Sequence, residues 1–183
     1  YSSCDIEDKA LLSTGTILVK RNLNELLAPT ITTNITANDE VFKAPFTPIV
    51  VTDHGTYEML LDGEVYTGEP INKLGNHTLL ITATGVDGST STAKVTFKVI
   101  AEITNETPVE DIIDQIINST DNVVEIEVKN DDLEVDKSIF EAIKGTDKTI
   151  SLTQEDGTVW TFEGKDIKDD NLENIGNIKI SVS

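Results

Sequence analysis

The stretch that decides the fold is Thr56–Val99, TYEMLLDGEVYTGEPINKLGNHTLLITATGVDGSTSTAKVTFKV. Its apolar residues come in short runs, which turn residues such as Asp62-Gly63 and Asp87-Gly88 separate. Asp-Gly between two apolar runs is a strong hairpin signal. In the last run apolar and polar residues alternate, as in a strand with one buried face. The stretch therefore predicts short strands at 57–61, 64–66, 77–84 and 93–100.

Upstream, the pattern predicts two more strands, at 30–32 and 45–51, the second confined to an edge or bulge by Pro45 and Pro48. Several short strands with turns between them are typical of a β-sandwich. The series resembles the second half of a bacterial immunoglobulin-like domain. The positions that carry the resemblance are Asp62-Gly63, Tyr66-Thr67-Gly68, Gly75, His77, Leu79, Ile81, Ala83, Gly88, Phe97 and Val99.

This resemblance covers about residues 29–100 and implies a spacer or binding module of an exported protein, without catalytic residues. The chain departs from the family pattern at Gly85 and Ser89, which stand where the family turn has Asp and Asn. The departure weakens the idea of a cation held at that turn.

After residue 100 the hydrophobic period changes. A capping box with Pro108 at the first helical position opens a helix with apolar Val109, Ile112, Ile113, Ile116 and Ile117 on one side. A half-buried strand at 124–128 follows, then a short helix that Asp136 caps and Gly145 ends. A hairpin at 149–162 and a last strand at 178–182 complete the pattern. Residues 101–183 are thus predicted to form a small α+β domain with helices packed on a mainly antiparallel sheet.

Trp160–Ile167 in that segment resembles a module that accompanies immunoglobulin-like repeats in clostridial and bacillary, Gram-positive surface proteins. This family implies little about function. Because the last predicted strand runs to residue 182, we expect further chain to follow it in the native protein. The overall expectation is a mainly β protein with an α+β part.

The N-terminal residues 1–28 are interpreted as an arm or as the tail of a preceding domain, with a strand at 16–19 and a helical turn at 22–27. Small residues precede Cys4, as at a bacterial lipoprotein processing site. Lipidation of Cys4 and a plain thiol are both open interpretations.

The charge excludes some partners. The chain has 33 acidic against 14 basic residues, a net charge of −19. Nucleic-acid affinity depends on Lys and Arg that neutralise phosphates, so we expect no nucleic-acid partner. Nor is there an apolar run of the length that spans a membrane.

No catalytic motif is present, and the chain is predicted not to be an enzyme. His54, His77 and Cys4 are too isolated to form a zinc site, and the two histidines are expected at the surface or in turns. The acidic loops Asn130–Asp136 and Asp166–Glu173 offer oxygen ligands for calcium, with Asp169, Asp170, Asn171 and Glu173 as the candidates. Neither loop has EF-hand spacing, and solvated turns or helix caps explain both. No other metal or cofactor is expected.

Two functions remain open. The first is a structural or interaction module of a secreted or cell-surface bacterial protein, acting as a spacer or as a protein-binding or adhesion domain with a protein or cell-wall glycan partner. The alternative is a carbohydrate-binding accessory module of a secreted polysaccharide-acting enzyme, which Tyr57, Tyr66 and Trp160 suggest. The only tryptophan, Trp160, is predicted to be a buried core anchor that shares a strand face with Phe162.

Overall fold

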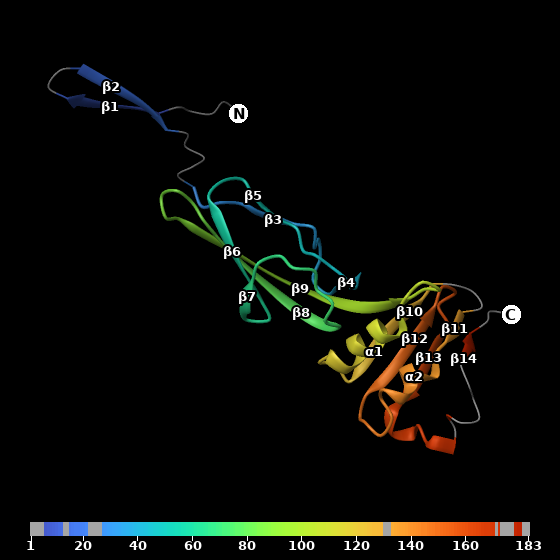
Figure 1. Cartoon of the computed structure of the whole chain (residues 1–183). Helices are drawn as coiled ribbons and strands as arrows, with labels where there is room; N and C mark the ends of the chain where they lie inside the picture. The colour runs from blue at the N-terminus through green and yellow to red at the C-terminus, as the bar shows by residue number, and fades with distance from the viewer. Residues whose placement is uncertain are drawn as a thin grey trace. The chain divides into compact units, whose positions relative to one another are not determined.

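The computed structural model describes residues 6–12, 15–21, 27–129, 133–170, 172 and 178–180 (Figure 1). This part of the chain is mainly β, with two α-helices in its second half. The chain divides into two compact units. The first contains Tyr1–Ala37, Pro48–Gly68 and Thr78–Val95, and the second contains Asn38–Thr47, Glu69–His77 and Thr96–Ser183. The predicted domain boundaries at residues 28 and 100 stay predictions.

The first unit is built from antiparallel pairs. Strands β1 and β2 form a hairpin, β3 pairs with β5, and β6 pairs with both β7 and β8. The predicted strand at 16–19 is confirmed within β2, whereas residues 22–26 of the predicted helical turn lie outside the described residues. The strands are β1 Ile6–Leu12, β2 Gly15–Arg21, β3 Ile31–Thr33, β5 Val50–Thr52, β6 Thr56–Leu61, β7 Glu64–Tyr66 and β8 Gly75–Thr84. The first three residues of β8 belong to the second unit.

The Asp62-Gly63 turn is confirmed between β6 and β7, with φ of 53° and 90° at the two residues. Positive φ at both central positions is what a tight type I′ hairpin requires. Along β8, alternate residues are buried, including Leu79, Ile81 and Ala83. Strand β9, Thr90–Ile103, follows β8 through the Gly85–Ser89 turn and continues into the second unit.

The sheet of the second unit is mixed. Its strand order is β13-β12-β10-β9, and β4 (Glu40–Lys43) also pairs with β9. β10 (Val123–Val128) runs parallel to both β9 and β12 (Thr149–Gln154), and only β13 (Val159–Glu163) is antiparallel to its neighbour in this order.

The prediction of a mainly antiparallel sheet is therefore wrong for this unit. The strands are parallel because of the segments that connect them. A parallel pair needs a crossover connection, and a helix between the two strands supplies it. Helix α1 (Val109–Asn118) lies between β9 and β10 in the chain, and α2 (Lys137–Glu141) lies between β10 and β12.

The two helices contact each other and cover one face of this sheet. Ile112 and Ile116 of α1, and Ile139 and Phe140 of α2, are buried together with alternate residues of the strands. Ile117, which was expected on the buried side of α1, is exposed. The strand residues on the covered face are Ala101, Ile103, Val124, Ile126, Val128, Ile150 and Leu152.

The ends of the helices differ in how well the sequence predicted them. Asp136 caps α2 as predicted, because its carboxylate accepts a hydrogen bond from the Ser138 N–H at 2.9 Å. The predicted capping box of α1 is wrong: the cap is Pro108 without a side-chain hydrogen bond. Thr107 Oγ1 instead accepts from the Thr104 N–H at 2.9 Å.

Two shorter elements complete the described second unit. Strand β11 (Leu133–Val135) pairs antiparallel with β14 (Ile178–Ile180), and Gly164–Asp166 form a single 3-10 turn after β13. The last predicted strand is thus confirmed over 178–180, and residues 181–182 lie outside the described residues. In the described ranges, no helix has the length and apolar character that a membrane span requires.

Candidate functional site

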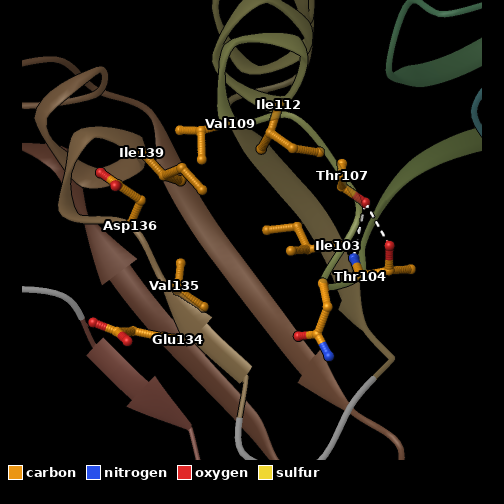
Figure 2. A pocket seen from close by; sticks show the side chains of 10 residues that line it. Ile103, Thr104, Thr107, Val109, Ile112, Glu134, Val135, Asp136 and Ile139 are labelled. Atoms are coloured by element: carbon orange, nitrogen blue, oxygen red, sulfur yellow. Dashed lines mark hydrogen bonds between the residues drawn. The ribbon is translucent and has the colours of Figure 1, made fainter.

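The second unit contains a small pocket where the end of β9 and the start of α1 meet β11 and the start of α2 (Figure 2). Its volume is about 280 Å³. The chain builds it from the last residue of β9, the first turn of α1 and the β11–α2 junction. The lining residues are Ile103, Thr104, Asn105, Thr107, Val109, Ile112, Glu134, Val135, Asp136 and Ile139.

The floor of the pocket is apolar. Figure 2 shows side chains of Ile103, Val109, Ile112, Val135 and Ile139 that point toward one another from four different elements. Four of them are almost fully buried, and Val109 is half-buried at the mouth. Because these side chains belong to the hydrophobic core, the floor is held in place by the packing of the fold itself.

The rim of the pocket is polar, and the charged residues among its described lining, Glu134 and Asp136, are both acidic. Thr104 and Thr107 are bonded to each other through their hydroxyl groups at 3.0 Å, as Figure 2 shows. Hydrogen bonds from the side chain and backbone of Ser138 hold the pKa of Asp136 below its ordinary value. The Asp136 carboxylate therefore stays ionised near neutral pH, and exposed Glu134 contributes a second carboxylate to the lining.

This composition limits the chemistry of the pocket. Among the described lining residues there is no histidine, cysteine or lysine, and the carboxylates of Glu134 and Asp136 are the groups that could accept a proton. Its volume lies just under the roughly 300–1,000 Å³ of typical small-molecule sites. The arrangement is suited to one apolar side chain of a polypeptide whose neighbouring residues are neutral or basic.

A second acidic pocket in this unit includes Glu102, Asp111, Asp114 and Gln115 in its lining. The Oε1 atom of Gln115 is buried without a hydrogen-bond partner. Within the described ranges, however, no three His, Cys, Asp or Glu side chains gather closely enough to hold a metal ion.

The face of the sheet opposite the helices carries ion pairs. Lys43 Nζ lies 2.8 Å from Glu102 and also contacts Glu127, and Lys129 Nζ lies 2.8 Å from Glu127. Partial burial by itself lowers the pKa of Lys43, but the two carboxylates outweigh this and raise it. Hydrogen bonds from Lys129 and Lys43 lower the pKa of Glu127. These pairs tie β4, β9 and β10 together and leave their charges mutually compensated.

The predicted calcium residues are only partly described. Asp169 forms an ion pair with Lys144, and Asp170 is exposed. Asn171 and Glu173 lie outside the described residues, as do Cys4 and the loop residues 130–132. Calcium binding and lipidation of Cys4 therefore stay predictions.

The two histidines lie in different surroundings. His54 is partly buried, with Nδ1 3.0 Å from Asp53 Oδ1 and Nε2 2.8 Å from the Leu27 carbonyl oxygen. His77 was expected at the surface or in a turn, and this is wrong: it is buried, and its ring stacks on Phe97. Its Nε2 lies 2.7 Å from the Lys73 carbonyl oxygen.

The prediction for Trp160 is also wrong. The register is as expected, since Trp160 pairs with Leu152 and Phe162 pairs with Ile150. Nevertheless, Trp160 is 50% exposed, and its Nε1–H donates to Gln154 Oε1 at 3.0 Å. β13 is the last strand in the order of its sheet, so a residue near its start can share a face with core residues and still lie beyond the helices that cover them. Tyr66, in contrast, is buried at 8% exposure, and Tyr57 is 41% exposed.

Comparison with known proteins gives little. Neither a protein-family model nor a curated protein sequence matches the chain. Among solved structures, the chain is similar to one of the fibronectin(III)-like modules of Clostridium thermocellum CbhA, with 19% identity and a TM-score of 0.29 over 40% of this chain. The match covers 47% of that structure, about half of its length.

Proposed function

We propose that this chain is a non-catalytic interaction module of a secreted or cell-surface protein of a Gram-positive bacterium. In this proposal the first unit is an immunoglobulin-like β-sandwich that acts as spacer, and the second unit is an α+β module that binds a partner protein. Support for the sandwich comes from the antiparallel pairs β3–β5 and β6–β8 and from the sequence resemblance over residues 29–100.

The observation that carries the binding role is the pocket between β9, α1, β11 and α2. It has a preformed apolar floor, a negatively charged rim and room for about one side chain. Such a pocket gives a protein partner an anchor point for one apolar residue, and anchors of this kind dominate many interfaces. Cell-surface adhesion through a protein ligand is the form of this role that we favour.

The test is a methyl NMR titration of the full chain with two short probes, acetyl-Lys-Leu-Lys-amide and acetyl-Lys-Ser-Lys-amide. The probes have the same charge and differ in the apolar side chain. We expect the leucine probe alone to shift the methyl signals of Ile103, Val109, Ile112, Val135 and Ile139.

A pair of charge reversals provides the matched control. Glu134→Lys at the rim should weaken binding of the leucine probe by several-fold, whereas Glu64→Lys, exposed in β7, changes the net charge equally and should have a much smaller effect. Equal shifts with both probes would contradict the binding role. Robust hydrolytic or transferase turnover by the purified chain would contradict the non-catalytic role.

Carbohydrate binding remains a second candidate because Trp160 is half exposed and its indole is held by Gln154. An exposed, oriented tryptophan can stack on a sugar ring. Of the three aromatic residues that suggested sugar binding, Tyr66 is buried and is not available to a sugar. A glycan array together with Trp160 fluorescence in the presence of soluble polysaccharide tests this candidate: a bound glycan that shifts the emission supports it, and no binder with unchanged emission ends it.

A further inference from the structure

Strand β13 is an open edge in the described part of the second unit. It is the terminal strand of the order β13-β12-β10-β9, and no described residue pairs with its outer side. Its other side pairs with β12 without a break, from the pair of Thr149 with Glu163 to the pair of Thr153 with Val159. The edge is thus five residues of regular strand, and one side of it is unpaired among the residues that the structure describes.

The direction of each backbone group follows from the hydrogen bonds at the two ends of the hairpin. Gln154 N–H donates to the Thr158 carbonyl at 2.9 Å, and Gly164 N–H donates to the Lys148 carbonyl at 2.8 Å. In an antiparallel pair, residues that bond to the partner alternate with residues that bond away from it. Trp160 and Phe162 therefore bond to β12, and the N–H and C=O groups of Val159, Thr161 and Glu163 point outward.

The side chains along this edge offer little of the usual protection. Natural edges carry charged residues, above all lysine, or proline or a bulge that prevents pairing. In its five residues β13 has no lysine, proline or bulge and one charged residue, Glu163 at its end, and it exposes Val159 (54%) on one face and Trp160 (50%) on the other. An open row of donors and acceptors beside exposed apolar side chains is the arrangement that accepts an added strand.

The charge around the edge selects the chemistry of that strand. Residues 155–166 hold four carboxylates, Glu155, Asp156, Glu163 and Asp166, against one ammonium group, Lys165. The whole chain has a net charge of −19, so a second copy would be repelled. A partner strand with basic residues is attracted.

We propose that β13 binds an extended segment of a partner protein, which adds to the sheet as an antiparallel strand with alternating apolar and basic residues. Residues opposite each other in an antiparallel pair share a face. The apolar residues of the partner then lie against Trp160 and Phe162, and its basic residues lie on the face of Glu163. This inference rests on the proposed protein-binding role and assigns it a second surface.

The probe is the peptide acetyl-Lys-Val-Lys-Val-Lys-Val-Lys-amide, titrated into the isotope-labelled full chain. Two further versions of this peptide carry N-methyl groups on backbone nitrogens. One is methylated at the three valines, and the other at the two inner lysines. All three peptides have the same charge, so non-specific attraction to the acidic chain is equal. We expect shifts of the amide signals of Val159, Thr161 and Glu163, together with a blue shift of Trp160 emission.

N-methylation of the inner lysines should weaken binding at least tenfold, because their N–H groups face β13 in the antiparallel arrangement. N-methylation of the valines should have a much smaller effect. Equal affinity of the two methylated peptides, or shifts that are absent from the β13 amides, would overturn the proposal.

A variant pair at one position gives an independent readout. Thr161→Pro removes the central outward N–H without removing a hydrogen bond to β12, and proline is tolerated at such edge positions. Thr161→Val keeps that N–H. We expect loss of peptide binding with Thr161→Pro and near-normal affinity with Thr161→Val; equal affinity of the two variants would contradict the proposal. The methyl signals of the pocket measure binding of the leucine probe independently of β13. The strand-addition proposal can therefore be contradicted while the pocket is still shown to bind.

Discussion

Trp160 lies at the edge of a sheet and not in the core. It faces the same side as buried Leu152, yet half of its surface is exposed because it lies on the terminal strand of its sheet. We expect its fluorescence to be red-shifted and readily quenched by acrylamide.

We also expect Trp160→Ala to lower the free energy of unfolding by only about 1 kcal/mol, because half of the side chain is already exposed. The comparison is Phe162→Ala on the same strand, whose ring centroid lies 4.6 Å from that of Phe140. Loss of this ring should cost about 3 kcal/mol. A blue-shifted, protected Trp160, or a larger loss at Trp160 than at Phe162, would restore the original prediction of a core anchor.

At the same scale, Glu127 links pH to stability. Its folded pKa is lower than its ordinary value because Lys129 and Lys43 bind the carboxylate. The resulting stabilisation is fully present at pH values above the ordinary glutamate pKa and is lost as the pH falls through the lowered folded value.

We therefore expect Glu127→Gln to destabilise the protein by about 1 kcal/mol at pH 7 and by less in acid. Denaturant unfolding of both proteins at pH 7 and pH 3 measures this. A difference that stays constant between the two pH values would show that the ion pairs do not stabilise the fold.

At the scale of elements, close packing at the end of the β12–β13 hairpin requires a glycine at position 164. This glycine is buried, its N–H donates to the Lys148 carbonyl, and its carbonyl accepts from Gly145 N–H at 2.8 Å. A Cβ atom at Gly164 would lie 2.2 Å from the Ile143 carbonyl oxygen. The contact is with backbone, so a small side-chain movement cannot relieve it.

We expect Gly164→Ala to destabilise the second unit by roughly 3 kcal/mol or more, in the range of severe overpacking. Gly157→Ala is the matched control in the turn of the same hairpin. Nothing lies within 4 Å of a Cβ there, and only its φ of +85° opposes alanine. It should cost about 1 kcal/mol. Thermal unfolding of both variants shows which one loses more stability. Equal losses of stability would contradict the close packing of Gly164.

The cap of α2 gives a further test at this scale. Asp136→Ala should cost about 1 kcal/mol because the Ser138 N–H loses its acceptor, whereas Asp136→Asn should cost little, since asparagine also caps helices. Chemical denaturation measures both. If both variants lose the same stability, the charge of Asp136, and not its capping hydrogen bond, stabilises the helix.

For the whole molecule, the sequence predicted local structure better than the arrangement of the sheet. Asp62-Gly63, the β9 alternation around Phe97 and the Asp136 cap depend on neighbours in the chain, and these predictions are confirmed. The parallel pairs of β10 and the exposure of Trp160 depend on which strands become neighbours and which strand is last. Local periodicity does not contain that information, although the helix between β9 and β10 was a usable signal for a parallel pair.

The candidate pocket was missed for the same reason. Its residues come from 103–112 and 134–139, and each was interpreted only within its own helix, strand or turn. The β9, α1, β11 and α2 elements bring these side chains together, and no spacing rule predicts such a set. The sequence predicted the capping role of Asp136 and the apolar helix side that carries Val109 and Ile112, but not that these residues meet.

The proposed role of the second unit is to bind a partner protein by recognising one apolar side chain. The most direct measurement is the methyl NMR titration of the full chain with the leucine and serine tripeptides. We expect saturable shifts at Ile139, Val135 and the other floor methyls with the leucine peptide alone, and smaller shifts in Glu134→Lys. The same small shifts with both peptides, spread over the surface of the chain, would contradict this role.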